Sequence, residues 1–593
     1  MNKKISLLAV LIIALVSLLV VSCGYVEDMP LIKTEEKPEF RILDCEVGVA
    51  TPLLKMAVLH PPLTFNPVMA LDDVSRLISA QLTATLYRFD PVKNTFDPWL
   101  ASGYDRGSES KIFTIHLRRN IVFSDGRPFT ADDVVETLNL ILQSAPEPSP
   151  LRVFLQFAGG TIGYSKIDDN TLQFTLPDST AAIEPILARI PALPHELIQE
   201  ARSQNRLSSL YELRSPPEEL PSIGPFMIQR FAPDENRVLL QRNPNFWAVD
   251  PAGQNLPYAR EVVISFANTS TEISMKFRTG ETDLIDFIPP EDSERLANVR
   301  GINIQDVGPS CSTVVAWFNL SRRTDPQTDQ PNIERWQFNL FAEPVFRQAV
   351  AGVIDRGALV SEVYMNQAVA AGSIISPQES LWYFETPFTQ LSTGAALQQL
   401  REINFTYNRG GGSPATYGRN NDQVSFSIAV LSGDTAAEKV ANRVETDLAN
   451  LGIRATVLSL PYEFFYKDLF SARPNYQMVV MTLLDPLHPF FMKEIMHSSS
   501  IRHYWYTQQD VAETDAEREI NTVLDRIFLH GEPGAKFEAA RRIQQLMDQS
   551  NFMITLVKPH GLFGAKGKIR NIRLSHRCAT MCWNLEEIFA LEE

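Results

Sequence analysis

The chain has 593 residues and a formal net charge of −16. This length is too great for one hydrophobic core and predicts two or three domains. The acidic charge argues against a nucleic-acid partner, because a phosphate-binding surface needs a basic field.

The first 23 residues have the pattern of a secretion signal. Two lysines precede the apolar run 7–21, and Ser22-Cys23 follows at once. Residues 20–23, Val-Val-Ser-Cys, resemble the lipobox of bacterial lipoproteins, which implies that residues 1–22 are a signal peptide and that Cys23 is lipidated. A single membrane-spanning anchor is the alternative. No other run approaches the roughly 18 apolar residues of a membrane span. We therefore expect the body to lie at the cell envelope, on the periplasmic or extracellular face of a bacterial membrane.

Residues 23–44 contain several acidic residues and two prolines but few large apolar groups. This composition is typical of a flexible tether.

Besides Cys23 the chain has an even number of cysteines, Cys45, Cys311, Cys578 and Cys582. In an exported chain this predicts two disulfides, with three possible pairings. Cys578 can pair with Cys582 only if a turn joins them, because an extended segment would separate the sulfurs by about 13 Å. A zinc site is the competing interpretation, but Cys-x-x-x-Cys has no second pair nearby. We expect no metal.

The stretch 111–142 is the most informative. Apolar and polar residues alternate over 113–118, which predicts a half-buried strand, and Asp125-Gly126 predicts a turn. Thr130 suits a helix N-cap, and acidic residues in the following turn favour the positive end of the helix dipole. The pattern is strand, turn, helix.

The identities of the residues in this stretch also indicate a family. Phe-Ser-Asp-Gly at 123–126 and Pro-Phe-Thr-Ala-Asp-Asp-Val at 128–134 resemble the signature of extracellular solute-binding proteins of ATP-binding-cassette (ABC) transporters. Within them the chain is similar to family 5, the oligopeptide, dipeptide and nickel group. Family resemblance continues at 224–228, 238–247, 347–356 and 583–588, in family order. It also implies that Phe65 and Asn66, which otherwise belong to a simple Asn-Pro turn, approach the ligand cleft.

Two further stretches predict the second half of the fold. Residues 311–320 are typical of a buried strand, and the resemblance implies that this strand enters a second lobe. Strand patterns at 424–430 and 453–457 flank a helix pattern at 440–451, which predicts a β-α-β unit with parallel strands.

The main candidate for ligand binding is Asp485. Residues 478–484 predict a buried strand, and Asp485 follows its carboxyl end, where ligands collect in open α/β sheets. In peptide-binding relatives an aspartate four residues before a proline receives the peptide's ammonium group, and Asp485 stands four before Pro489. Leu483 and Leu484, which precede it, belong to the same predicted site. The alternative is that Asp485 only caps a turn.

Tyr504 and Trp505 belong to the aromatic run 502–506, which can line a pocket or pack between helices. We include both among the candidate ligand contacts.

Catalytic motifs are missing from the sequence: it has no Gly-x-Ser-x-Gly, His-Glu-x-x-His or phosphate-loop pattern. The alternative of a secreted hydrolase depends on a catalytic acid pair such as Asp132 and Asp133. Adjacent carboxylates on a helix do not face each other, so this pair is weak evidence. We expect neither an enzyme nor a cofactor.

The resemblance therefore implies a two-lobed α/β periplasmic-binding-protein fold with an extra subdomain. Its expected parts are lobe I at 45–310 with an insertion at about 71–200, lobe II at 311–555, and a return at 556–593, with a hinge near 311–320 and 550–558. We expect a monomeric lipoprotein that binds peptides between its lobes and delivers them to an ABC permease. A non-peptide solute (oligosaccharide, nickel complex or opine) and a surface lipoprotein for adhesion or signalling are the alternatives.

Overall fold

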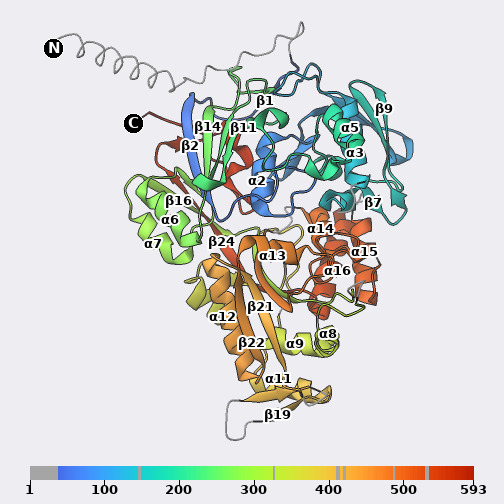
Figure 1. Ribbon diagram of the computed structural model, residues 1–593, viewed down its shortest axis with the longest axis vertical. Helices are drawn as coiled ribbons and strands as arrows, with labels where there is room; N and C mark the ends of the chain where they lie inside the picture. The colour runs from blue at the N-terminus through green and yellow to red at the C-terminus, as the bar shows by residue number, and fades with distance from the viewer. Residues whose placement is uncertain are drawn as a thin grey trace, which may run out of the picture.

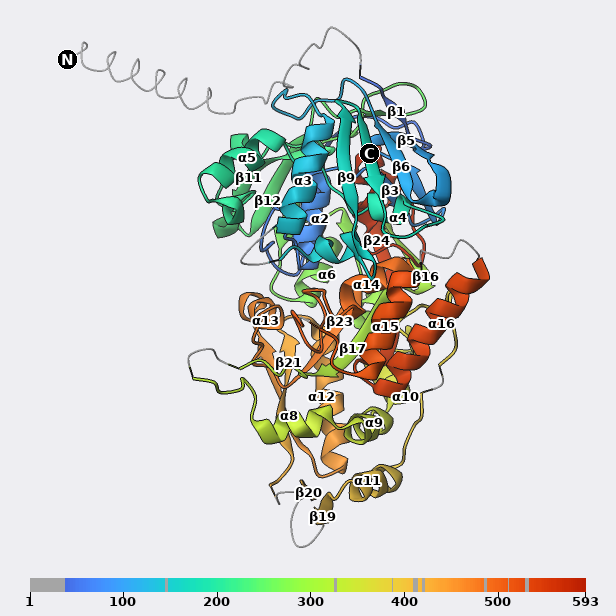
Figure 2. The same cartoon turned by 90° about the vertical axis from the view of Figure 1, so that its right-hand side faces the viewer.

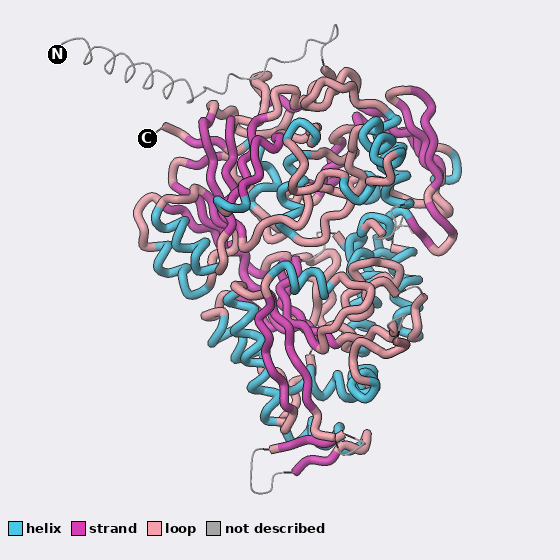
Figure 3. Tube along the Cα trace, in the orientation of Figure 1, coloured by secondary structure: helices cyan, strands magenta, loops and turns pink. Residues whose placement is uncertain are grey.

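The computed structural model describes residues 38–143, 148–324, 328–386, 388–408, 414–418, 422–484, 488–509, 511–527 and 533–592. Cys23 and Asp485 lie outside these residues. The chain forms two lobes, upper and lower in Figure 1, each built of strands and helices (Figure 3). We call the upper part, residues 38–310 and the segment after β24, lobe I, and residues 311–550 lobe II; β24 (Ile554–Lys566) runs through both. The predicted two-lobed α/β fold is confirmed.

Lobe I contains two four-stranded sheets. In the first, β14 is parallel to β2 and the other neighbours are antiparallel, in the order β11 (Phe226–Ala232), β12 (Arg237–Arg242), β14 (Ala259–Phe266), β2 (Thr51–Val58). The second is antiparallel, in the order β5 (Ala101–Arg106), β6 (Ile112–Leu117), β10 (Thr171–Thr175), β9 (Gly163–Asp168). It lies entirely within the predicted insertion. The helices of this lobe are α2 (Asp73–Leu82), α3 (Ala131–Gln143), α4 (Glu184–Leu187), α5 (His195–Ser203), α6 (Ser270–Thr279) and α7 (Pro290–Ala297).

The strand, turn and helix predicted in lobe I are confirmed. Phe113, Ile115 and Leu117 of β6 are buried, as the alternation requires. The Thr130 hydroxyl accepts a hydrogen bond from the amide of Asp132 (3.3 Å), at the start of α3. Asp133 accepts from the amides of Thr130 (2.7 Å) and His195 (2.8 Å), so this carboxylate joins the beginnings of α3 and α5.

Lobe II is built on a larger sheet that continues into lobe I. Its order is β15 (Leu284–Ile285), β24, β17 (Ser312–Phe318), β23 (Met478–Leu484), β21 (Ser425–Leu431), β22 (Arg454–Leu460), and β16 (Ile302–Pro309) and β18 (Ala368–Ala370) also pair with β24. The predicted β-α-β unit is present: β21 and β22 are parallel, and α12 (Thr435–Asn450) connects them. Val440, Val444 and Leu448 bury the apolar face of α12, and Gly452 reverses the chain at φ 74°.

The other helical elements of lobe II surround this sheet (Figures 1 and 2). They are α8 (Arg335–Ala342), α9 (Pro344–Val353), α10 (Arg356–Ala358), the π-helix η6 (Leu359–Val363), α11 (Thr393–Glu402), α13 (Tyr462–Leu469), η7 (Pro489–Phe491), α14 (Met492–Met496), α15 (Asp515–Arg526) and α16 (Pro533–Ser550). Pro344 opens α9, where its missing N–H costs nothing.

Strand β24 connects the two lobes. Its first half pairs with β17 and β18 of lobe II, and its second half pairs with β15 and β16 of lobe I. The chain crosses between the lobes twice here, once from β16 to β17 and once along β24. The predicted domain limits remain a prediction.

The flexible tether predicted to extend to residue 44 ends earlier. Arg41–Ile42 form strand β1, which pairs in parallel with β13 (Ala248–Val249), and the Leu43 side chain is buried. An apolar side chain inside an acidic, proline-containing stretch thus fixes the start of the folded body.

Pairs of short strands and 3₁₀ helices make up the rest of the fold. The two-stranded pairs are β3 (Tyr87–Asp90) with β4 (Thr95–Pro98), β7 (Gln156–Phe157) with β8 (Gly160–Thr161), β19 (Thr406–Asn408) with β20 (Ala415–Tyr417), and β25 (Ile569–Arg570) with β26 (Phe589–Ala590). The 3₁₀ helices include η2 (Pro150–Leu155) and η8 (Met581–Glu587). Among the described helices, none is long and apolar enough to cross a membrane.

Candidate functional site

A cavity of about 650 Å³ lies between the lobes. Lobe I lines it with the end of β2 and one face of α2, and lobe II lines it with the end of β23, the start of α12 and α14. A volume of this size is within the range of pockets for small ligands. We call it the inter-lobe cavity.

The sheet of lobe II brings polar groups to this cavity at the carboxyl ends of parallel strands. Strands β21 and β23 are parallel neighbours, so they end at the same edge. Asp434 follows β21 and accepts hydrogen bonds from the amide of Ala437 (3.0 Å) and the hydroxyl of Thr482 on β23 (3.5 Å). Asp434 is the N-cap of α12. It lines the cavity together with Thr482 and Leu484.

Asp286 supplies a second carboxylate, from lobe I. It accepts hydrogen bonds from the Thr580 hydroxyl (2.5 Å) and the Met581 amide (2.8 Å). Burial raises the pKa of Asp286 to about 6, and burial also raises the pKa of Asp434. Within the described part of the chain neither carboxylate has an ion-pair partner, so both acidic groups face the cavity uncompensated.

Arginines dominate the other side of the cavity, next to α14. Glu494 of α14 forms ion pairs with Arg76 of α2 and with Arg502, whose Nη1 lies 3.0 Å from Glu494 Oε1. Burial opposes ionisation of Glu494, but the guanidinium groups of Arg76, Arg502 and Arg189 outweigh it and lower its pKa to about 2. The carboxylate of Glu494 thus interacts electrostatically with several guanidinium groups.

Arg189 is the cation of this group that has no carboxylate in contact. Its guanidinium lies 3.7 Å above the Phe491 ring and 5.2 Å from that of Phe154, and burial lowers its pKa to about 10. Its Nε is buried without a hydrogen-bond partner, and among the described residues no carboxylate lies within ion-pair distance. Arg189 lines the cavity and remains a cation at neutral pH.

The acidic and arginine groups lie on opposite sides of the cavity. Asp434 adjoins α6, because the Ser270 amide donates to the carbonyl of Gly433 (2.9 Å), whereas Arg189 adjoins η7 and α14. Helices α6 and α14 lie on opposite sides of the junction between the lobes in the view of Figure 1, α6 on the left and α14 on the right. The cavity therefore has an acidic side and an arginine side.

The lobes touch on both sides of the cavity. Near the acidic side, Lys439 Nζ of lobe II lies 2.7 Å from Glu291 Oε1 of lobe I. Near the arginine side, Phe154 of lobe I packs on Phe490 of lobe II with ring centroids 5.1 Å apart. Between them, His60 stacks on Tyr462 at 5.1 Å. We call this arrangement, with the lobes in contact on both sides of the cavity, the closed arrangement.

Only one of the described candidate residues lines the cavity. Leu484 does so, and Asp485, which directly follows it, lies outside the described residues. Leu483 is buried in the sheet because alternate side chains of a strand point to opposite faces.

Phe65 and Asn66 are structural in lobe I. The Phe65 ring packs edge-on against Phe231 (5.5 Å), and the Asn66 side chain bonds the carbonyl of Leu210 (3.2 Å) and the amide of Val68 (2.9 Å). The turn interpretation, and not the approach to the cleft, describes them.

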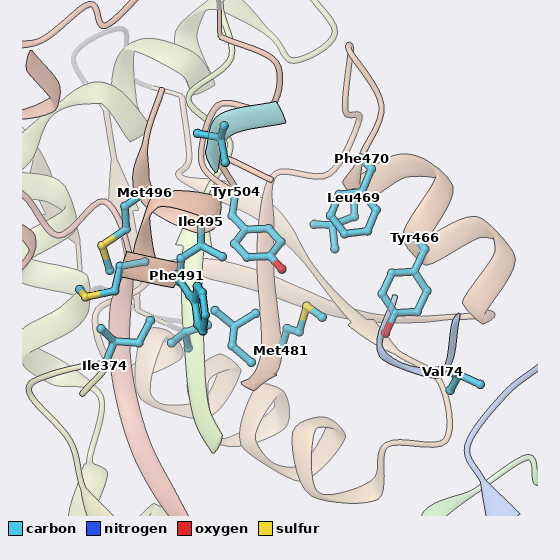
Figure 4. Packing of buried hydrophobic residues seen from close by; sticks show 14 of the residues in the cluster. Val74, Ile374, Tyr466, Leu469, Phe470, Met481, Phe491, Ile495, Met496 and Tyr504 are labelled. Atoms are coloured by element: carbon cyan, nitrogen blue, oxygen red, sulfur yellow. The ribbon is translucent and has the colours of Figure 1, made fainter. Parts of the chain in front are cut away.

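Tyr504 and Trp505 belong to the core of lobe II and are fully buried. Tyr504 packs among Trp317 and Phe470, as Figure 4 shows in part, and its hydroxyl accepts a hydrogen bond from Arg502. Trp505 donates to Glu517 (3.2 Å). Their neighbour Arg502 lines the cavity, so the run 502–506 contributes a cation and not an aromatic surface.

The predicted disulfides are not formed. None of the described cysteines, Cys45, Cys311, Cys578 and Cys582, forms a disulfide. Cys578 Sγ accepts from the Ser575 amide (3.2 Å), whereas Cys582 Sγ lies 3.2 Å from Met56 Sδ, so these two thiols have separate neighbours.

Sequence reasoning missed Asp434, Asp286, Arg76, Arg189 and Glu494. Asp434 carried a usable signal, since it follows a predicted strand and precedes a predicted helix at a sheet edge that collects ligands. The others lie in stretches without a motif.

The family model for bacterial extracellular solute-binding proteins, family 5 Middle, matches residues 95–500. A probable ABC transporter-binding protein of Deinococcus radiodurans is 23% identical over 436 residues, which are 71% of each chain. Two solved structures share the fold. The oligopeptide-binding protein AppA of Bacillus subtilis, solved with a nonapeptide, has a TM-score of 0.78 at 17% identity, over 92% of this chain and 100% of that one. The periplasmic binding protein MelB of Agrobacterium fabrum, solved with stachyose, has a TM-score of 0.78 at 19% identity, over 92% and 86%.

Proposed function

Because the chain belongs to family 5 of the bacterial extracellular solute-binding proteins, we propose that it is the solute receptor of an ABC importer and captures short peptides in the inter-lobe cavity. Ligand would favour the closed arrangement over an open one, and the permease would recognise the closed form.

The observation that carries this proposal is the separation of unpaired charges across the cavity. A peptide with free ends is an ammonium at one end and a carboxylate at the other. Asp434 faces the cavity on its acidic side, Arg189 faces it on the arginine side, and Asp286 is a further carboxylate of the lining. A bound peptide would supply the missing partner to each, and buried charges without partners are costly.

Asp485 is proposed as a further ammonium acceptor. It directly follows Leu484, which lines the cavity, at the carboxyl end of β23. It would add to the charge of Asp434, which follows the neighbouring strand. The resemblance to peptide-binding relatives supports the same role.

The attachment to a membrane is also a proposal. The lipobox at 20–23 supports lipidation of Cys23, and several acyl chains, each methylene contributing about 0.8 kcal/mol, would hold the protein firmly at the envelope. The folded body begins by residue 41, which leaves a short spacer.

The decisive experiment is mass spectrometry of small molecules released by denaturation from protein purified without its first 23 residues. A ladder of short peptides is the expected result. A single oligosaccharide, nickel complex or opine would keep the transport role and reject the peptide ligand; MelB, with its stachyose, is a relative in fold that binds a sugar.

Titration calorimetry with refolded, ligand-free protein then tests the charge pairing. Trialanine should bind, and both N-acetyl-trialanine and trialanine amide should bind at least tenfold more weakly, because each lacks one charge. Equal affinity for all three would reject the assignment of termini to the two sides.

Absence of a permease gene near this one would instead favour a role in adhesion or signalling.

A further inference from the structure

A second cavity, of about 320 Å³, lies inside lobe II. It is bounded by α9, α16 and residues 372–374 and 388–391, and it shares no lining residue with the inter-lobe cavity. Helix α14 separates the two: Met492 and Met496 face the second cavity, whereas Glu494 and Ile495 face the first. Figure 4 shows Met496 and Ile374, which line the second cavity, on one side of Ile495. We call it the lobe II pocket.

A buried arginine forms one wall of this pocket. Arg356 is 3% exposed, and it donates from Nε to the carbonyl of Thr555 (3.0 Å) and from Nη1 to the carbonyl of Ala351 (2.9 Å). Its guanidinium lies 4.6 Å from the centre of the Phe388 ring. Nη2 makes no hydrogen bond to the described residues, and no described carboxylate is within ion-pair distance. The carbonyls and the ring hold this cation in place and leave one of its edges unused.

An unpaired carboxylate lines the same pocket. Asp548 of α16 is half-buried, and its carboxylate has neither a hydrogen bond nor an ion pair with any described residue. Arg356 and Asp548 influence each other's charge, so they are close, yet they do not touch. The Gln399 Oε1 atom is buried in the same lining and has no hydrogen-bond partner among the residues that the structure describes.

The rest of the lining is suited to an apolar group. Met492, Met496, Met547 and Met553 contribute four flexible, polarisable side chains that adapt to irregular shapes. A group of opposite charges beside an adaptable apolar surface matches a molecule that carries a cation, an anion and a hydrocarbon chain on one centre. The volume is about half that of the inter-lobe cavity.

We propose that the lobe II pocket binds one free α-amino acid with an apolar side chain. Its carboxylate would accept from Arg356, its ammonium would donate to Asp548 and to the free Gln399 oxygen, and its side chain would lie among the methionines. Charge-assisted hydrogen bonds of this kind are short and strong. The proposal does not depend on what the inter-lobe cavity binds.

The test is titration calorimetry of L-leucine and L-methionine into refolded, ligand-free protein of the full folded chain. One saturable site per chain is expected. Asp548→Asn should weaken binding about tenfold or more, because the ammonium loses its charged acceptor. Glu538→Gln on the exposed face of the same helix should bind as the unchanged protein does. Melting temperatures establish that both variants fold.

Ligand variants make the test independent of mutation. Leucine amide and N-acetyl-leucine should each bind the unchanged protein at least tenfold more weakly than leucine does. No heat of binding up to millimolar leucine, or equal affinity of the Asp548→Asn variant, would overturn the proposal and identify a water-filled cavity.

Competition separates this site from the inter-lobe cavity. Leucine should bind with the same affinity to Asp434→Asn and in the presence of saturating trialanine. Displacement by trialanine would place the amino acid between the lobes and would reject the lobe II pocket. If trialanine itself fails to bind while leucine binds, only the peptide function falls.

Discussion

The two sides of the inter-lobe cavity differ in whether their buried charges have ion-pair partners. On the arginine side, Glu494 is ion-paired with Arg76 from the other lobe and with Arg502 from its own. Asp434 on the acidic side, and Asp286 elsewhere in the lining, have hydrogen bonds but no ion-pair partner among the described residues. The paired Glu494 holds the lobes together without a ligand, whereas Asp434, Asp286 and the unpaired Arg189 offer charge that only an added molecule can balance. Stability should therefore depend on the first and affinity on the second.

Removal of the shared carboxylate, Glu494, should have the largest effect. Glu494→Gln leaves several guanidinium groups close together without their ion-pair partner, and loss of one partner of a buried pair costs about 3 to 5 kcal/mol. We expect a loss of this order in the free energy of unfolding by urea. Glu538→Gln, which loses only an exposed contact, should change it by less than about 0.5 kcal/mol. An unchanged midpoint for Glu494→Gln would show that the network contributes nothing.

The same kind of change at Asp485, the proposed ammonium acceptor, should spare stability. We expect Asp485→Asn to weaken peptide binding at least tenfold, about 1.4 kcal/mol or more, because the ammonium loses a charged acceptor. The melting temperature of the ligand-free protein should remain nearly unchanged. Calorimetric titration checks the affinity, and equal affinity in the two proteins would remove Asp485 from the site.

A lower pH should stabilise the ligand-free protein through protonation of Asp286. Its pKa is about 6 when folded and about 3.9 when unfolded, so the folded state binds more protons between these values. The free energy of unfolding therefore rises as the pH falls from 6 to 4, by about 1 kcal/mol or more from this group. Asp286→Asn should flatten that part of the profile. Urea titrations of both proteins at a series of pH values measure the difference.

Arg189 should give the smallest effect. Arg189→Met keeps an apolar contact with Phe491 and removes a cation from a crowded positive group, so the stability of the free protein should hold or rise slightly. Affinity for trialanine should fall about three- to fivefold, under 1 kcal/mol, while affinity for trialanine amide stays the same. An equal loss for both ligands would mean that Arg189 does not meet the carboxylate.

The sequence predicted the scaffold better than the site. Alternation and apolar runs identified β6, β17, β23 and the β21–α12–β22 unit, because burial on one or both faces leaves a local pattern. The inter-lobe ion pair could not be predicted this way, since Arg76 and Glu494 are 418 residues apart. Tyr504 and Trp505 were misassigned because a buried aromatic cluster and a pocket wall have the same composition.

The single strand β24 has a consequence for how the protein unfolds. Its amides and carbonyls pair with β17 and β18 of lobe II at one end and with β15 and β16 of lobe I at the other, so strands of both lobes lose a partner without it. Separating the lobes in sequence would leave unpaired strand edges on both fragments. The two lobes thus form one cooperative unit, and a calorimetric scan should contain a single transition in which both melt together.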